Sequence, residues 1–421
     1  MSNAVRKRIV YAISVELKSP LCISQGDGVL TDDDVLLNGE GVPFVPGASL
    51  AGAMRGYIEK DKQQECIFGF EDMSLNKGRM SSLFVSDLFF DGTVSTVVRD
   101  GVSLSENKTA LTQGKFDMEV VDTGAQGQFF LELVVREKDD EASFQSQLEQ
   151  VFFGWREREI RLGKKKSRGF GEISLQSIVK KEFDAHNYLE YKDAYCPIEE
   201  KDNTWTIVDL SKLSAQEEKY VTITVPLKLE GGISIRQYSV KKGEPDFVHI
   251  TANGQPVIPG TSFTGAIRHR LTDILTQLGV VNRAEIIDST FGYVRPKSGD
   301  AHISHVVVGE CVIAGSKRLE MVRNGISRFE SGSRSGALFK ELSYIGGTTQ
   351  LEIKVKKTGD EDAMVGLLLL ALMDVQNGFL AVGGQTAIGR GLFSANGELT
   401  VHSDKSREEY LKKAFEALRR E

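Results

Sequence analysis

The sequence predicts an α+β protein in which one folding unit occurs twice in tandem. Two observations carry this prediction. Part of the first half of the chain recurs in the second half, and both halves show the same succession of strand-like and helix-like patterns. The composition is that of a folded protein, since 40% of the 421 residues are hydrophobic and 26% are charged, which excludes disorder over the whole length. The longest apolar run, residues 363–373, is shorter than the ~20 residues that a membrane span needs.

The repeat is clearest in a stretch that contains a Pro-Gly turn and the start of a helix. Residues 33–55 read DDVLLNGEGVPFVPGASLAGAMR, and residues 246–268 read DFVHITANGQPVIPGTSFTGAIR, with 10 identities in 23 positions and no gap. This register places Asp33 over Asp246. Further matching pairs follow in the same order: 66–70 with 289–293, 79–87 with 302–310, 99–103 with 323–327, and 163–171 with 383–391. The chain therefore contains one domain duplicated.

Each copy is expected to open with a strand, at 9–17 and at 221–229, because polar and apolar residues alternate there. A polar loop with the aspartates then leads through the Pro-Gly turn into a helix, with Ser49 or Ser262 expected at its N-cap and Gly52 allowing close packing. Next come a strand (83–90; 305–313), a polar loop, another strand (129–136; 349–355) and a second helix (142–158; 362–377). A Gly-rich loop and a last strand close the unit. This order is typical of ferredoxin-like, RNA-recognition-type domains.

The repeat and the composition of the segments between and after the copies predict the domain boundaries. The first domain covers 1–182 and the second 219–402. Residues 183–218, with nine acidic and three basic residues, are predicted to be an acidic linker or an irregular excursion. Residues 403–421 are predicted to form a short amphipathic helical tail that docks on the protein or contacts a partner. The cysteines are isolated, with no CxxC pair, which favours a reducing, cytoplasmic location.

The basic residues are clustered although the net charge is −7. Seven basic and two acidic residues lie in 155–168, and the loop 163–171 reads GKKKSRGFG. Glycines permit positive φ and close approach, so this loop could gather amides and the side chains of Lys164, Lys165, Lys166 and Arg168 around an anion. The loop lacks the sequence of a nucleotide-hydrolysing P-loop. It favours contact with a nucleic-acid backbone, the alternative being a tight turn with solvated charges.

Each copy contains a Gly-rich loop and a Pro-Gly element, which reads PFVPGASLAGAMR in the first copy and PVIPGTSFTGAIR in the second. With these motifs both copies resemble the RAMP (repeat-associated mysterious protein) superfamily. They are most similar to the backbone subunits of type III CRISPR effector complexes, and two units in one chain resemble the fused double subunits of subtype III-D. The resemblance implies a filament of such units along a guide RNA, with other RAMP-type subunits as partners. It also implies that β-hairpin thumbs, at 99–116 and 323–339, flip nucleotides of a complementary single-stranded target RNA.

The resemblance also implies roles for individual residues. The contacts with the guide fall on residues of the Pro-Gly helices and the Gly-rich loops: Ser49, Arg55, Lys164, Lys165, Lys166 and Arg168 in the first copy, and Ser262, Arg268 and Arg390 in the second. An aspartate before the Pro-Gly turn would cleave the target, which is Asp33 in the first copy and Asp246 in the second. A shift in the triple aspartate would make it Asp32 or Asp34. The second Gly-rich loop has Thr386 and Ile388 in place of Lys166 and Arg168, so it should hold phosphate more weakly.

An aspartate at this place makes chemical sense for RNA cleavage. A carboxylate can act as general base towards the 2′-hydroxyl, or it can hold Mg²⁺ or Mn²⁺ together with RNA oxygens, so Asp33 and Asp246 are also the candidate metal ligands. The sequence leaves two other functions open. One is a guide-binding structural subunit without catalysis. The other is a guide-processing endoribonuclease, which should use a histidine acid–base pair, although no histidine repeats between the copies.

Overall fold

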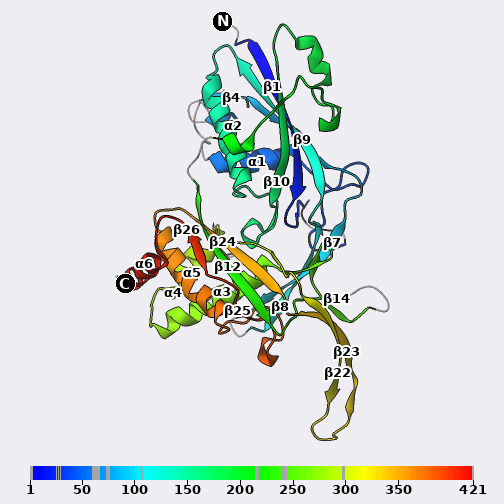
Figure 1. Ribbon diagram of the computed structural model, residues 1–421, viewed down its shortest axis with the longest axis vertical. Coiled ribbons are helices and arrows are strands. Elements are labelled where there is room, and N and C mark those ends of the chain that lie inside the picture. The colour runs from blue at the N-terminus through cyan, green and yellow to red at the C-terminus, as the bar shows by residue number, and fades with distance from the viewer. Residues whose placement is uncertain are drawn as a thin grey trace. The chain divides into compact units, whose positions relative to one another are not determined.

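The computed structural model describes residues 3–24, 26, 28, 30–58, 67–72, 76–105, 108–213, 218–238, 244–295 and 299–419. The chain divides into two compact units (Figure 1). The first comprises Met1–Val98, Met118–Lys164 and Phe170–Glu218, and the second comprises Arg99–Asp117, Lys165–Gly169 and Lys219–Glu421. Two segments of the first repeat thus belong to the second unit. In the described part of the chain, no helix is long and apolar enough to cross a membrane.

The first repeat and the segment after it contain short and long strands around two helices. Their bounds are β1 (Val5–Leu17), β2 (Phe44–Val45), α1 (Gly47–Ile58), β3 (Phe70–Asp72), β4 (Lys77–Arg79), β5 (Leu83–Val85), β6 (Leu88–Phe90), β7 (Thr96–Leu104), β8 (Ala110–Val121), β9 (Gln126–Arg136), α2 (Glu141–Arg156), β10 (Ile173–Phe183) and β11 (Thr206–Ile207). The main sheet has the order β11-β10-β1-β9-β6-β2, with β5 also paired to β9. The predicted strand at 83–90 is therefore two short strands.

The core of the first unit lies between this sheet and the helices α1 and α2. Side chains of β1 and β9, such as Ile13 and Leu131, pack with Leu50 of α1 and Trp155 of α2, all of them fully buried. Asp140 begins α2, because its carboxylate accepts a hydrogen bond from the amide of Ser143 at 3.2 Å. The apolar periodicity that predicts these elements is thus the pattern that the core uses.

Residues 183–218 pack on the other face of the same sheet. Phe183 and Ala194 are buried with Val10 of β1, and the ring of Trp205 packs edge-on against Phe183. This second covering explains why β1 is buried on both faces from Ile9 to Ile13, where alternation alone predicts one solvated face. The segment is also tied by Tyr191, whose hydroxyl donates to the carboxylate of Glu132 at 2.8 Å.

The helix α1 begins three residues earlier than the sequence indicates. Gly47 is its first residue, so the expectation that Ser49 caps it is wrong, and Ser262 likewise lies in the first turn of α3 (Gly260–Gln277) rather than at the cap. The amide of Gly47 instead donates to the Asp87 carboxylate at 2.7 Å. Glycine is required there, because a Cβ atom would lie 2.4 Å from the Val85 carbonyl oxygen. Gly52, by contrast, faces open space.

The second unit repeats this plan. Its elements are β12 (Tyr220–Glu230), β13 (Gly232–Ile233), β14 (Arg236–Tyr238), β15 (Phe247–His249), β16 (Thr251–Ala252), β17 (Gln255–Ile258), α3, α4 (Arg283–Phe291), β18 (Tyr293–Arg295), β19 (Asp300–His302), β20 (Val306–Val308), β21 (Cys311–Val312), β22 (Lys317–Ile326), β23 (Ser333–Ile345), β24 (Thr348–Lys356), α5 (Glu361–Gln376), β25 (Leu392–Ala395), β26 (Thr400–His402) and α6 (Arg407–Arg419). The main sheet has the order β20-β24-β12-β25, with β26 also paired to β12. The four corresponding strands, β10-β1-β9-β5 in the first repeat and β25-β12-β24-β20 in the second, therefore have the same order, while β11, β6 and β2 extend the first sheet alone.

The predicted C-terminal tail forms α6, which packs on α5. Tyr410 and Ala414 are buried there, and Gly366 of α5 permits the contact, because its Cβ atom would lie 2.1 Å from the Tyr410 carbonyl oxygen. Glu421 and residue 420 lie outside the described residues. Of the two functions that the sequence offers for this tail, docking on its own chain is the one that these contacts describe.

Each repeat also carries a β-hairpin at the place where a thumb is predicted. Strands β7 and β8 pair in the first, where residues 106 and 107 lie outside the described residues. Strands β22 and β23 pair in the second, from Lys317 opposite Ile345 to Ile326 opposite Ser333, and this hairpin projects from its unit (Figure 1).

Candidate nucleic-acid interface

The aspartates Asp33 and Asp246 occupy corresponding places beside the second strand of each hairpin. Asp33 forms a parallel bridge with Met118 of β8, and its carbonyl oxygen accepts a hydrogen bond from the Glu119 amide at 2.9 Å. In the second repeat the carboxylate of Asp246 accepts from the Lys340 amide of β23 at 2.8 Å, just before β15 pairs in parallel with β23. The gapless alignment thus places both aspartates at the base of a hairpin.

The side chains around the two aspartates differ. The carboxylate of Asp33 forms an ion pair with the ammonium of Lys164 from the first Gly-rich loop, and it accepts a hydrogen bond from the Ser24 hydroxyl at 3.3 Å. Gly384 stands at the position of Lys164 in the second repeat. Among the residues that the structure describes, no lysine or arginine forms an ion pair with Asp246. Within the described residues, the first aspartate is therefore the one that has a cation paired with it.

The neighbours of Asp33 in the triple aspartate differ from it in their contacts. The carboxylate of Asp34 accepts hydrogen bonds from the amides of Leu30 and Thr31 at 3.0 and 2.9 Å, and from the Thr31 hydroxyl at 2.8 Å. These bonds close a local turn, which gives Asp34 a role in shaping the loop. Asp32 is exposed. Of the three, Asp33 is the one whose carboxylate meets the Gly-rich loop.

Neither aspartate is part of a ready-made metal site. In the described ranges of the chain, no group of three histidine, cysteine, aspartate or glutamate side chains gathers in a way that could hold a metal ion. At Asp33 the ammonium of Lys164 already supplies the positive charge. A divalent ion therefore does not fit the protein side chains alone, and oxygens of RNA would have to complete its coordination.

The two Gly-rich loops have the same backbone. Each forms a 3₁₀ turn, Lys166–Arg168 or Thr386–Ile388, between two left-handed residues. The residues before the turns, Lys165 and Gln385, have φ of 54° and 60°. The closing glycines Gly171 and Gly391 are required, because a Cβ atom at either would lie 1.8 Å from a carbonyl oxygen of Leu162 or Val382.

Four backbone amides of the first loop donate hydrogen bonds within the protein. Those of Lys164 and Gly171 donate to the carbonyl oxygens of Cys22 and Pro20, and those of Arg168 and Gly169 close the turn onto Lys165 and Lys166. The expectation that consecutive amides of this loop bind an anion is therefore not met for these four groups.

The first loop presents cations in different ways. The ammonium of Lys165 lies 4.0 Å from the centre of the Phe116 ring, and Lys166 is exposed. Arg168 is half-buried, and its buried Nη1 atom has no hydrogen-bond partner in the described part of the chain. Burial, and then the positive charge of Arg268 on α3, lower the pKa of Arg168. Two like charges with an unpaired buried donor form a place where an anion would be stabilised.

Arg268 has one acidic neighbour, since its guanidinium pairs with the carboxylate of Asp288 at 3.1 Å. Ser49, Ser262 and Arg55 are half-buried on α1 and α3. The amides of the two serines donate to Pro46 and Pro259 at 2.8 and 2.9 Å, so the hydroxyls are the groups that remain for a ligand.

The second Gly-rich loop lacks such charges. Gln385 turns inward and donates to the Glu341 carboxylate at 2.8 Å, and Ile388, at the position of Arg168, is 59% exposed. Arg390 stands at the position of the buried Phe170, and its Nη2 atom lies 3.1 Å from the Met321 sulfur. The predicted guide contact at Arg390 is thus directed against its own unit.

Several residues at the hairpin bases were not identified from the sequence. Glu341 is fully buried beside the Gly-rich loop, where the Ser234 hydroxyl donates to it at 2.6 Å and the Arg236 guanidinium at 3.3 Å. Burial alone would raise the pKa of Glu341, but these hydrogen bonds, the one from Gln385 and the charge of Arg236 lower it overall. Arg99 and Glu310 form a second buried pair. Recurrence of Arg99 at Arg323 was the sequence feature that could have drawn attention to this region.

His249, three residues after Asp246, is a core histidine. It is buried, its Nδ1 atom accepts from the Ile235 amide and its Nε2 atom donates to the Val257 carbonyl oxygen, both at 3.0 Å. Burial lowers its pKa to about 4, although the bond to Val257 opposes this. Its ring atoms are engaged in the core, which leaves none for a reacting RNA.

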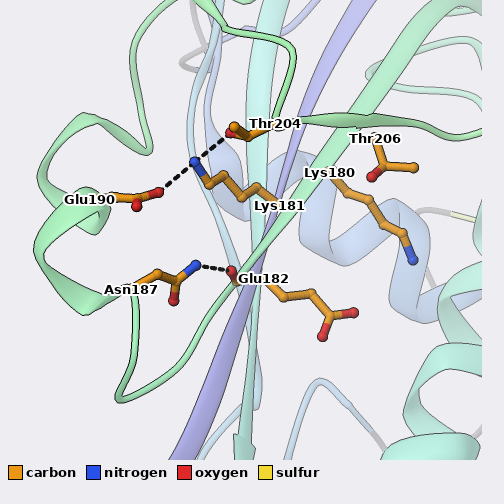
Figure 2. Close-up of a pocket in the computed structure, with 7 residues that line it drawn as sticks. All are labelled: Lys180, Lys181, Glu182, Asn187, Glu190, Thr204 and Thr206. Atoms are coloured by element: carbon orange, nitrogen blue, oxygen red, sulfur yellow. Dashed lines mark hydrogen bonds and ion pairs between the residues drawn. The ribbon is translucent and has the colours of Figure 1, made fainter.

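A pocket of about 400 Å³ opens beside β10, and Figure 2 shows the residues that line it. Lys181 there donates to the Thr204 hydroxyl at 2.6 Å and pairs with Glu190 at 2.7 Å. The side-chain amide of Asn187 donates through its Nδ2 atom to the Glu182 carbonyl oxygen at 2.8 Å. None of the predicted site residues lines this pocket.

Comparison with known proteins bears on both repeats. A family model described as the RAMP superfamily matches residues 14–174 and 231–394. The two matched segments correspond to the two repeats and contain the aspartates and Gly-rich loops described above. A search of the curated proteins found no match.

Proposed function

Because the chain belongs to the RAMP superfamily, we propose that it is a double backbone subunit of a type III CRISPR ribonucleoprotein, related to subtype III-D, that binds guide RNA and cleaves complementary target RNA. Family membership points to a CRISPR-associated RNA-binding subunit. The strand order that both sheets share supports two ferredoxin-like domains. The hairpins β7–β8 and β22–β23 would then serve as the thumbs.

One observation carries the RNA-binding part of this proposal. In the first Gly-rich loop the half-buried Arg168 lies near Arg268, and the buried Nη1 atom of Arg168 has no partner within the described residues. A phosphate would accept a hydrogen bond from that donor and reduce the repulsion between the two guanidinium groups. Phosphate contacts of this kind position a nucleic acid without reading its sequence, as a guide-binding subunit requires.

The cleavage part rests on the pair of Asp33 and Lys164. In the proposed step, Asp33 takes the proton of a target 2′-hydroxyl and that oxygen attacks the adjacent phosphorus. The bond to the 5′-oxygen breaks, and the Lys164 ammonium gives this leaving oxygen its proton. The products are a 2′,3′-cyclic phosphate and a 5′-hydroxyl. Since the described side chains alone gather no metal site, a Mg²⁺ or Mn²⁺ ion at Asp33 would need oxygens of the RNA to complete its coordination.

The second repeat favours a different function, binding without cleavage. Gly384 replaces Lys164, so Asp246 would lack the group that protonates the leaving oxygen. The Asp246 carboxylate also accepts from the backbone of β23. If one repeat is a structural guide-binding module, it is therefore the second.

Crosslinking tests the proposal directly. Purified ribonucleoprotein with photoreactive uridines in its guide RNA would be irradiated, digested and analysed for RNA-bearing peptides. We expect crosslinks in 164–168 and in the first two turns of α3, and fewer in 385–390. A complex whose guide crosslinks only outside both Gly-rich loops, or a chain that carries no RNA, contradicts it.

A further inference from the structure

The base of the first hairpin is anchored by a buried ion pair. The guanidinium of Arg99 on β7 donates to both carboxylate oxygens of Glu310, at 2.7 Å through Nη1 and 3.3 Å through Nη2. The two side chains are only 5% and 6% exposed. The Nη2 atom also lies 3.4 Å from the Thr251 carbonyl oxygen. A two-pronged pair of this kind fixes direction as well as distance.

Contacts of Tyr238 hold both strands of the same hairpin. The Tyr238 amide donates to the Asp100 carboxylate of β7 at 3.1 Å. The ammonium of Lys115 on β8 lies 4.4 Å from the centre of the Tyr238 ring. All these residues belong to the second compact unit, which includes Arg99–Asp117.

Glu310 also lies against the first Gly-rich loop. A Cβ atom on Gly169, whose φ is +92°, would come within 2.8 Å of the Glu310 amide nitrogen. The carbonyl oxygen of Arg168 lies so close to Gly260, at the start of α3, that a Cβ atom there would be 2.4 Å away. One acidic residue therefore touches the hairpin through its side chain and the Gly-rich loop through its backbone.

The second hairpin lacks this arrangement. Arg323, which matches Arg99 in the repeat, lies 3.9 Å from Glu341 of its own hairpin, and its Nη2 atom lies 3.8 Å from the Met321 sulfur. Asp87, which matches Glu310, accepts from the Gly47 amide instead. In the second hairpin the buried carboxylate is instead that of Glu341 on the hairpin itself, which accepts a hydrogen bond from Gln385 of its own Gly-rich loop.

We propose that Glu310 is a positioning residue: through Arg99 it fixes the first hairpin relative to the Gly-rich loop Lys165–Gly169, and so determines at which phosphate the first repeat acts. The second half of this statement rests on the proposed function. The first half concerns only the protein. Without the pair the hairpin would move about its base while the loop kept its place, and a target held by that hairpin would be cut at neighbouring phosphates.

The test uses hydrogen–deuterium exchange of the purified chain or complex, without target RNA, and then cleavage of a labelled complementary RNA. Glu310→Gln keeps the shape of the side chain and removes its charge. We expect amides of β7 and β8 to exchange about tenfold faster while those of β22 and β23 are unchanged. The product of the first site should spread over adjacent positions with little change in total rate.

Two further variants separate positioning from general stability. The reversed pair Arg99→Glu with Glu310→Arg should restore slow exchange and a single cut position, whereas Glu310→Arg alone should not. Arg323→Gln, the matched change in the second hairpin, should leave β7 and β8 as they are. Unchanged exchange of β7 and β8 in both Glu310 variants overturns the proposal, as does equally faster exchange throughout the second unit. If neither the wild type nor any variant cuts RNA, the proposed cleavage is wrong. The exchange measurement still tests whether Glu310 positions the first hairpin.

Discussion

The two Gly-rich loops have one backbone and two sets of side chains. Both place a left-handed residue, a 3₁₀ turn and a left-handed glycine in the same order. The first carries three lysines and an arginine, and the second carries glycine, glutamine, threonine and isoleucine at the four matching positions. The glycines therefore specify the conformation, and the residues between them decide whether the loop can hold phosphate. A Gly-rich motif alone identifies a shape and not a binding site.

The same difference extends to the aspartates. Asp33 has Lys164 beside it, and Asp246 has the Lys340 amide. Duplication preserved the position of the carboxylate and changed its partner. The account therefore expects the two repeats to be unequal, the first in catalysis and in RNA binding.

The largest expected effect is on cleavage. Asp33→Asn keeps the size of the side chain and removes the base, so the product of the first site should fall by about 10²–10⁴-fold. Asp246→Asn should reduce the amount of the second site's product. The reduction should be smaller if that site already cleaves slowly in the wild type. Gel analysis of labelled target RNA, with and without EDTA, measures both and shows whether either cut needs a divalent ion.

The triple aspartate requires its own control. Asp32→Asn should leave the pattern unchanged, and Asp34→Asn should act through the turn at Leu30 and Thr31. A full product ladder from a chain with Asp32, Asp33, Asp34 and Asp246 all changed to Asn, in a complex with no other intact backbone subunit, would show that the catalytic assignment is wrong and that the chain only binds.

The next largest effect is on stability at acidic pH, where we expect the second unit to be more sensitive than the first. His249, with its pKa lowered to about 4 by burial, stays neutral in the folded protein, whereas in the unfolded chain it titrates near 6.5. Between these values the unfolded chain binds more protons, so stability present above about pH 6.5 is lost as the pH falls towards 4. The full loss is about 3 kcal/mol. Leu36 occupies the matching position in the first repeat.

Urea unfolding of wild type and His249→Gln between pH 4 and 7 measures this. The second unit should lose stability over that range in the wild type, and the glutamine variant should be less sensitive to pH whatever its stability at pH 7. Parallel curves for the two proteins would mean that other groups cause the acid sensitivity.

The smallest expected effect is a gain of binding in the second loop. Thr386→Lys and Ile388→Arg place cations on the same backbone frame as Lys166 and Arg168. The dependence of RNA affinity on salt should become steeper by up to ~0.7 in the log–log slope for each new contact. Val281→Lys with Ile303→Arg adds the same charge at exposed sites outside the loop, and an equal gain there would show that only net charge matters.

The repeated order of elements was predictable because the periodicity of strands and helices reflects which side chains are buried. The boundaries were less so. Helix α1 begins at Gly47 because Asp87, distant in sequence, binds its first amide, and no local pattern indicates that bond. The covering of β1 by residues 183–218 depends on aromatic side chains in a segment whose acidic composition predicted a linker or an irregular excursion.

For the candidate site, the sequence identified the residues better than their partners. The register of the repeat predicted the correspondence of Asp33 and Asp246, but not that Lys164 would meet the first of them. Arg390 was predicted to be a cation of the second Gly-rich loop, because it lies between two glycines of that loop. In the alignment of the repeats it matches Phe170, and in the structure its guanidinium lies against the Met321 sulfur. Pairs such as Arg99 and Glu310 join residues from the two repeats, so comparison of one repeat with the other does not reveal them.

The measurement that tests the inequality of the two loops most directly is the salt dependence of guide-RNA affinity. Lys164, Lys165, Lys166 and Arg168 would be changed to Ala together, and compared with Gln385→Ala, Thr386→Ala and Ile388→Ala in the second loop. A charge control would change four exposed lysines elsewhere, which are Lys212, Lys228, Lys412 and Lys413. The account predicts a slope flatter by up to ~0.7 per lost contact for the first loop alone. Equal slopes for the first-loop variant and the charge control, in folded proteins, would contradict it.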